Sequence, residues 1–142
     1  MRLRTEGFYM NKNKKDFVLR WFEKANNDLK NIKNNLAAKD VPVDTVCFHA
    51  QQAIEKYLKG ALIYKNKEVS KTHDLVKLLS EVKKFIPELG KLEEELERIT
   101  EYAVETRYPD TFLEPSLEEA KHSYSLAIKI KKIVISKLKI VP

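Results

Sequence analysis

The chain has 142 residues, of which 43% are hydrophobic and 34% charged, and its formal net charge is +6 at pH 7. Such a chain forms one domain that buries roughly two-thirds of its unfolded surface, and its hydrophobic content excludes intrinsic disorder. The positive charge favours an acidic partner, either a nucleotide, RNA or an acidic protein surface. The single cysteine, Cys47, excludes an intramolecular disulfide and a CxxC metal site, which fits a reducing interior.

No stretch of the sequence reaches the roughly 18 consecutive apolar residues of a membrane span, and no apolar signal segment opens the chain. We therefore expect a cytoplasmic protein with no membrane partner. Only three glycines are present, and long runs are rich in Leu, Lys, Glu and Ala. This composition predicts helices joined by short turns.

Residues 1–15 show no sustained hydrophobic periodicity and predict a flexible leader, followed by a single domain over residues 16–142. The domain opens with a helix whose apolar residues recur every three or four positions. These residues are Val18, Phe22, Ala25, Leu29, Ile32 and Leu36. Phe17 and Trp21 lie beside this seam, where they either widen the core stripe or form a dimer surface anchored by tryptophan.

The most apolar helix is predicted from Val43 to Lys65, after a proline at position 42 ends the first helix. One stripe has the spacing of a helix lying deep in a bundle. It comprises Val46, Ala50, Ala53, Tyr57, Ala61 and Tyr64. The opposite face mixes charge, amide, imidazole and apolar groups, and is either solvated or a contact surface. It comprises Phe48, His49, Gln52, Lys56, Lys59 and Ile63.

Three further helices complete the predicted fold. Ser70 or Thr72 caps a third helix, and Pro87 begins a fourth. Residues 106–115 contain two prolines and predict a loop, after which a capping-box pattern at Ser116 opens a fifth helix. Together these segments predict an all-α protein, an up-and-down antiparallel bundle of four to five helices.

The fifth helix is unusually apolar, because Ile and Val cover most of its circumference between residues 126 and 141. Coverage by the bundle on one side and by a second subunit on the other explains this pattern. A helix that frays into an extended tail is the alternative.

Neither a metal centre nor a cofactor is expected from the sequence. The histidines, His49, His73 and His122, fall in three different predicted elements, and HExxH is absent. The glycine-rich loops that cradle phosphates, GxGxxG and GxxxxGK, are also absent.

Two polar segments remain as candidates for binding. The first, Thr72-His73-Asp74, opens the third helix, where its side chains serve exposed backbone N–H groups or project toward a ligand. The second is the segment 107–110, where the guanidinium of Arg107 suits phosphate or carboxylate, Tyr108 suits stacking on a base, and Asp110 offers an acceptor. Capping of neighbouring helix ends is the alternative role for this second segment.

The segments FHAQQAIEKYLK at residues 48–59, KTHDL at 71–75 and RYPD at 107–110 occur in an order and spacing that closely resembles the HEPN domain family. The resemblance implies a bundle of four or five helices, usually dimeric. It also implies a minimal nucleotidyltransferase as partner, often in a toxin–antitoxin pair, and an affinity for nucleotides or RNA.

Many HEPN proteins are metal-independent ribonucleases in which an arginine is followed after four to six residues by histidine. Here the permitted positions after Arg107 are Phe112, Leu113 and Glu114, so the pattern is absent. A ribonuclease needs a group that manages the 2′-hydroxyl proton as well as a cation, and the local imidazole is missing.

Three hypotheses follow from the sequence. The first is a non-catalytic, dimeric partner of a nucleotidyltransferase that holds nucleotide or RNA through His49, Lys56, Arg107 and Tyr108. The second is a divergent metal-independent ribonuclease toxin that uses His49 with Arg107. The third is a purely structural helical interaction module. The candidate ligand-binding residues are His49, Gln52, Lys56, His73, Arg107, Tyr108 and Asp110.

Overall fold

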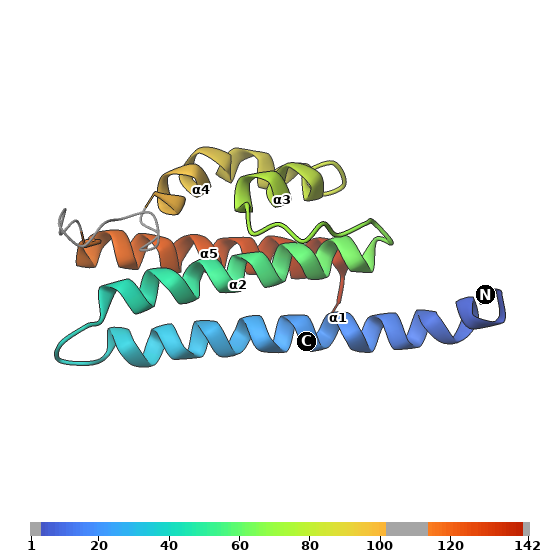
Figure 1. Cartoon of the computed structure of the whole chain (residues 1–142), viewed down its shortest axis with the longest axis horizontal. Helices are drawn as coiled ribbons and strands as arrows, with labels where there is room; N and C mark the ends of the chain where they lie inside the picture. Colours follow the sequence, from blue (N-terminus) through green and yellow to red (C-terminus); the bar gives the residue numbers. More distant parts are fainter. Residues whose placement is uncertain (1–3, 102–113, 141–142) are drawn as a thin grey trace.

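The computed structural model describes the backbone of residues 4–101 and 114–140, and the side chains from residue 13 onward within those ranges. The regular elements of these ranges are all helical. They are α1 (Arg4–Leu36), α2 (Val43–Tyr64), α3 (Leu75–Val82), the 3-10 helix η1 (Pro87–Leu92), α4 (Glu93–Thr100) and α5 (Leu117–Leu138). They stack in three layers, with α1 on one side, α2 and α5 in the middle, and α3, η1 and α4 on the other side (Figure 1). The predicted all-α bundle is confirmed.

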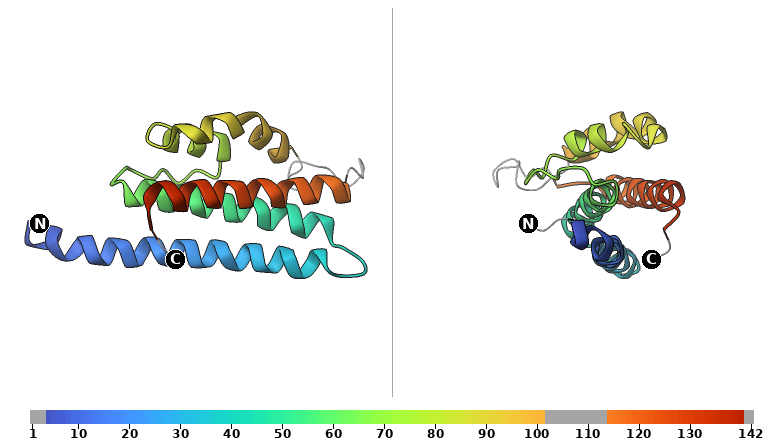
Figure 2. Two further views of the ribbon diagram at one scale, coloured as in Figure 1. Left: turned by 180° about the vertical axis from the view of Figure 1, so that it is seen from behind. Right: turned by 90° about the vertical axis from the view of Figure 1, so that its right-hand side faces the viewer.

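Neighbouring helices run in defined directions. α1 and α2 are antiparallel, since Lys14 near the start of α1 donates to Asn66 just after α2, at 3.0 Å. α5 lies beside α2 and runs in the same direction, because the chain crosses back through the connection 65–74 and the α3–α4 layer (Figures 1 and 2). α2 thus makes most of its helix contacts with α1, α3 and α5.

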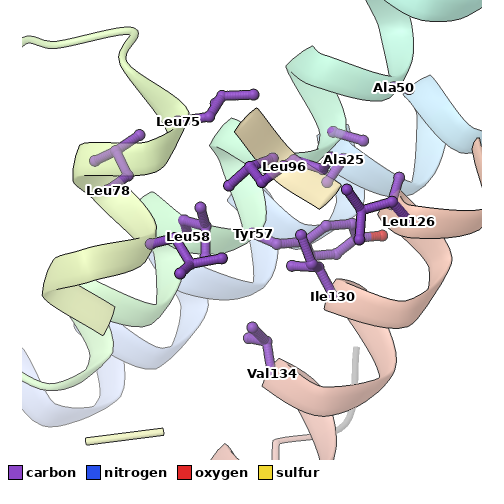
Figure 3. Packing of buried hydrophobic residues seen from close by; sticks show 14 of the residues in the cluster. Ala25, Ala50, Tyr57, Leu58, Leu75, Leu78, Leu96, Leu126, Ile130 and Val134 are labelled. Carbon is purple, nitrogen blue, oxygen red and sulfur yellow. The ribbon is translucent and has the colours of Figure 1, made fainter. Parts of the chain in front are cut away.

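α2 supplies the centre of the core, as its apolar stripe predicts. Val46, Ala50, Ala53, Tyr57 and Ala61 are all fully buried, whereas Tyr64, the last residue of the predicted stripe, is partly buried. Figure 3 shows the α2 side chains of Tyr57 and Leu58 gathered with residues of other helices, among them Ile130 of α5 and Leu78 of α3. The hydrophobic effect of this shared burial holds the three layers together.

The first helix begins well before the apolar seam that predicted it. α1 begins at Arg4, so residues 4–15 are helical, whereas the weak periodicity predicted no regular structure there. Once a helix is nucleated, each further residue adds one backbone hydrogen bond. Residues 8–15 contain neither proline nor glycine to stop this extension. Apolar periodicity reports the buried part of a helix and misses such an extension.

The third and fourth segments also differ in detail from prediction. Asp74, not Ser70 or Thr72, caps α3, and its carboxylate accepts from the backbone N–H of Lys77 at 3.2 Å. Thr72 instead accepts from the backbone N–H of Asp74 at 3.0 Å. The segment that follows Pro87 opens as the 3-10 helix η1 and becomes α-helical only at Glu93.

The fifth helix follows the sequence closely. Ser116 and Glu119 form the predicted capping box, with mutual side-chain to backbone hydrogen bonds of 3.0 and 2.8 Å. α5 stays helical to Leu138, which contradicts the alternative of a fraying helix. Its outer apolar residues are partly buried against the core of the same chain: Ile128, Ile133 and Ile135. Their coverage by a second subunit stays a prediction. No described helix is long and apolar enough to cross a membrane.

Candidate ligand-binding face on helix α2

A buried carboxylate of α1 organises one polar side of α2. Asp28 is 8% exposed, and its two oxygens face two α2 side chains that lie two turns apart. His49 Nδ1 lies 2.8 Å from Oδ1, and Lys56 Nζ donates to Oδ2 at 2.6 Å. Because a buried charge is stable only when it is paired and hydrogen-bonded, Asp28 fixes both α2 side chains in place.

This contact determines how His49 presents its imidazole. Nδ1 faces the carboxylate and carries a proton, so the neutral ring leaves Nε2 as an acceptor. Nε2 makes no hydrogen bond within the part of the chain that the structure describes, and the side chain is 25% exposed. The ring of Phe48 stands edge-on to the imidazole with centroids 5.4 Å apart, and Phe48 is itself 51% exposed. An oriented imidazole and an exposed aromatic ring thus adjoin each other on the surface.

A second carboxylate, Glu55, organises the neighbouring part of the same face. Lys59 donates to Glu55 Oε2 at 2.9 Å, and both residues are 8% exposed. His73, from the connection between α2 and α3, places Nδ1 3.0 Å from the same oxygen, while most of its side chain is exposed. His73 therefore ties this connection to α2, and it does not serve the start of α3, which Asp74 caps.

Gln52 lies between the two carboxylate-centred clusters. It is partly exposed, and its side-chain amide makes no hydrogen bond to any described residue. We call the surface formed by His49, Gln52, Lys56 and His73 with Asp28 and Glu55 the α2 polar face. Four of the predicted candidates thus lie on one surface, bounded by α1 on one side and by the connection 65–74 on the other.

The remaining candidates, Arg107, Tyr108 and Asp110, lie outside the described residues. The contact between His49 and Arg107 that the ribonuclease hypothesis requires is therefore still a prediction. The described end of α4 is attached to α2, because the Gln51 amide donates to the carbonyl oxygen of Ile99 at 2.9 Å. Gln51 accordingly has a structural role, whereas the adjacent Gln52 faces outward.

The family comparison covers both clusters. A model of the HEPN domain family matches residues 18–138. The chain belongs to the HEPN domain family. Comparisons with curated proteins and with solved structures gave no significant match. The matched range contains all of α2 to α5 and α1 from Val18 onward, so the α2 polar face lies within the HEPN domain.

Sequence reasoning missed the carboxylates that build this HEPN surface. One indication was the position of Asp28, a charged residue next to Leu29 within the apolar seam of the first helix. Glu55 carried another, since Lys59 follows at the i, i+4 spacing of a helical ion pair. Neither pattern predicts that a histidine also contacts the carboxylate. In each case the histidine belongs to a different element of the fold from the carboxylate that it contacts.

The third histidine of the HEPN domain lies on a different surface. His122 of α5 places Nε2 2.9 Å from Glu95 of α4, and Lys129 lies 3.8 Å from the other oxygen of Glu95. Among the described residues, no group of three or more histidine, cysteine, aspartate or glutamate side chains is placed to hold a metal ion. The predicted inert cysteine, Cys47, is buried at the α2–α5 contact.

Proposed function

We propose that this HEPN protein is the non-catalytic, dimeric partner of a minimal nucleotidyltransferase in a toxin–antitoxin type pair, and that its α2 polar face binds nucleotide or RNA. The partner supplies the catalysis. Family membership supports the partner role. The absence of an Arg-x4–6-His pattern after Arg107 supports the lack of ribonuclease chemistry.

The observation that carries the ligand-binding part is the fixed cluster around Asp28. Lys56 uses one of its three N–H donors on Asp28 and is 24% exposed, so its other donors are available to a ligand. His49 Nε2 and the Gln52 amide add an acceptor and further donors on the same surface. Because Asp28 holds His49 and Lys56 in place before binding, a ligand that contacts them pays little ordering entropy.

The charges on this face favour recognition by hydrogen bonds over attraction by net charge. Asp28 is paired with Lys56, and Glu55 is paired with Lys59. The four charges of these two pairs cancel. The face therefore suits the edge of a base or a ribose hydroxyl, with one phosphate on Lys56, better than it suits a long phosphate backbone.

Calorimetric titration of the full chain with ATP, AMP and a short single-stranded RNA tests this proposal. His49→Ala and Lys56→Ala are each expected to weaken binding about tenfold, as loss of a hydrogen bond to a charged or oriented group does. Lys30→Ala removes an exposed lysine of α1 and is the matched control, which keeps the wild-type affinity. Equal affinity in all four proteins contradicts the assignment of the site.

The partner role has a separate test. Co-expression with the product of an adjacent nucleotidyltransferase gene, followed by size-exclusion chromatography with light scattering, is expected to give a complex that contains two copies of this chain. A strictly monomeric protein that co-purifies with no transferase contradicts the proposal.

A divergent metal-independent ribonuclease is the second candidate, and the orientation of His49 favours it. A carboxylate on Nδ1 and an open Nε2 are the arrangement in which an imidazole accepts a proton from a 2′-hydroxyl. RNA cleavage in the presence of EDTA that is lost in both His49→Ala and Arg107→Ala establishes this activity. Absence of cleavage by the wild-type protein rejects it. Nucleotide binding abolished by Arg107→Ala, in turn, rules out a purely structural module.

A further inference from the structure

A cleft lies between the η1–α4 segment and α5. Its volume is about 520 Å³, and it is lined by Lys91, Leu92, Glu95, Lys129, Lys132 and Ile133. It shares no residue with the α2 polar face, which is built from α1, α2 and the connection 65–74. The end-on view in Figure 2 shows α5 and α2 side by side, with α5 on the opposite side of the bundle from the connection 65–74.

Polar contacts join the two walls of the cleft. Toward the end of α5, Lys137 donates to Glu88 of η1. Toward the start of α5, His122 lies 2.9 Å from Glu95 of α4, and Lys129 lies 3.8 Å from it. Glu95 is the only acidic residue among the described residues of the lining, and these contacts pair it with His122 and Lys129.

Two lysines of the lining add positive charge to the cleft, and the charge of Lys91 also acts on Glu88 of η1. Lys91 and Lys132 stand on opposite walls, both are exposed, and neither forms an ion pair with any residue that the structure describes. The floor between them is apolar, since Leu92 is 5% exposed and Ile133 is packed against the core. A ligand complementary to this surface carries negative charge on both sides of an apolar group.

This chemistry favours an acidic protein segment over a nucleic acid. Among the residues that the structure describes, the lining contains no aromatic side chain for stacking on a base and no arginine for a bidentate contact with phosphate. A phosphate backbone has no apolar group for the Leu92 and Ile133 floor. A peptide in which acidic residues flank a leucine or a similar side chain matches both features.

We propose that this cleft docks an acidic segment of a partner protein, with an apolar side chain of that segment seated on Leu92 and Ile133. The proposal deepens the partner role proposed above and rests on it in assuming such a partner. Because the cleft and the α2 polar face are separate, one chain holds its partner and a nucleotide at the same time.

Fluorescence anisotropy with the full chain tests the cleft directly. The probe is a fluorescein-labelled peptide of repeated Glu-Leu-Glu-Glu units, and Glu-Gly-Glu-Glu repeats give the probe without the apolar side chain. Reversal of both cleft lysines, Lys91→Glu with Lys132→Glu, is expected to weaken binding of the leucine peptide about tenfold. The matched control, Lys30→Glu with Lys33→Glu on α1, changes the net charge equally and is expected to weaken it by about twofold or less. Thermal melts verify that both variants are folded.

Equal weakening by the two double variants shows attraction by net charge alone and overturns the proposal, as does equal affinity for the two peptides. The same variants in the co-expressed complex separate the two proposals. A transferase complex that survives reversal of Lys91 and Lys132 overturns the docking site and leaves the partner role intact. Peptide binding that depends on the two lysines, without any transferase complex, refutes the partner role and leaves the docking site intact.

Discussion

The substitution Gly60→Ala is expected to destabilise the protein, although alanine is the better helix former. Gly60 lies in the interior of α2, and a Cβ atom there stands 2.6 Å from Cε1 of Phe22 and 3.2 Å from its Cδ1. Phe22 is fully buried and packs on Tyr57, with ring centroids 5.6 Å apart. Because this ring is fully buried, it cannot turn out into solvent, and we expect α1 and α2 to separate locally.

The expected magnitude is the difference of two effects. Overpacking of a close-packed core costs about 1–3 kcal/mol, and a contact of 2.6 Å lies far inside the normal approach of two carbon atoms. Replacement of glycine by alanine in a helix interior returns up to about 1 kcal/mol. Since so close a contact places the cost of overpacking at the upper part of its range, about 2–3 kcal/mol, the net loss of unfolding free energy is about 1–2 kcal/mol. The melting temperature falls by roughly 4 °C per kcal/mol in a chain of this size.

Urea denaturation followed by far-UV circular dichroism measures this loss. Gly90→Ala is the matched control, because the nearest atom to a Cβ there is Cδ of the flexible Lys83 side chain at 3.8 Å, and it is expected to change stability by about 0.5 kcal/mol or less. Phe22→Leu is expected to cost less in the Gly60→Ala background than in the wild type. A Gly60→Ala protein as stable as the wild type would refute the close contact of α1 with α2.

Three further predictions concern single contacts. Ser116→Ala removes half of the α5 capping box and is expected to lower the unfolding free energy by about 1 kcal/mol in urea denaturation, whereas an unchanged midpoint contradicts the cap. Burial, with a smaller effect of the Asp28 charge, raises the pKa of Tyr57 well above its usual value, so the unfolded chain loses this proton first and stability falls as pH rises above about 10. Tyr57→Phe is expected to lessen that fall in denaturation measured at several alkaline pH values, and an identical pH dependence refutes the assignment. The hydrogen bond from Lys137 lowers the pKa of Glu88, so Lys137→Ala is expected to return that pKa toward its usual range in an NMR titration, and no movement of the Glu88 signal contradicts the pair.

Most of the fold could be predicted because burial on a helix follows a local period. The seam from Val18 to Leu36 and the stripe from Val46 to Ala61 gave two of the three long helices and the faces that they bury. The capping box at Ser116 gave the start of the third. The prediction failed where no apolar period exists, as in residues 4–15 of α1, and where several residues compete to cap a helix, as before α3.

For each contact in the candidate site, the sequence indicated only one of the two partner residues. The positions of His49, Gln52 and Lys56 on one face follow from the helical repeat alone. Their fixation depends on Asp28, which no pattern within α2 can indicate. His73 was assigned to the start of α3 by its position, yet its imidazole contacts Glu55 of α2.

The sequence by itself thus determined an all-helical HEPN domain and the two faces of α2, since side chains that repeat every three or four residues share one side of a helix whatever surrounds it. The tertiary structure decided what these side chains do. His49 and Lys56 acquire their common partner from 21 and 28 residues away, and His73 acquires Glu55 from 18 residues away. Ion pairs and hydrogen bonds require atoms within a few ångströms, and only the packing of separate helices brings these atoms so close.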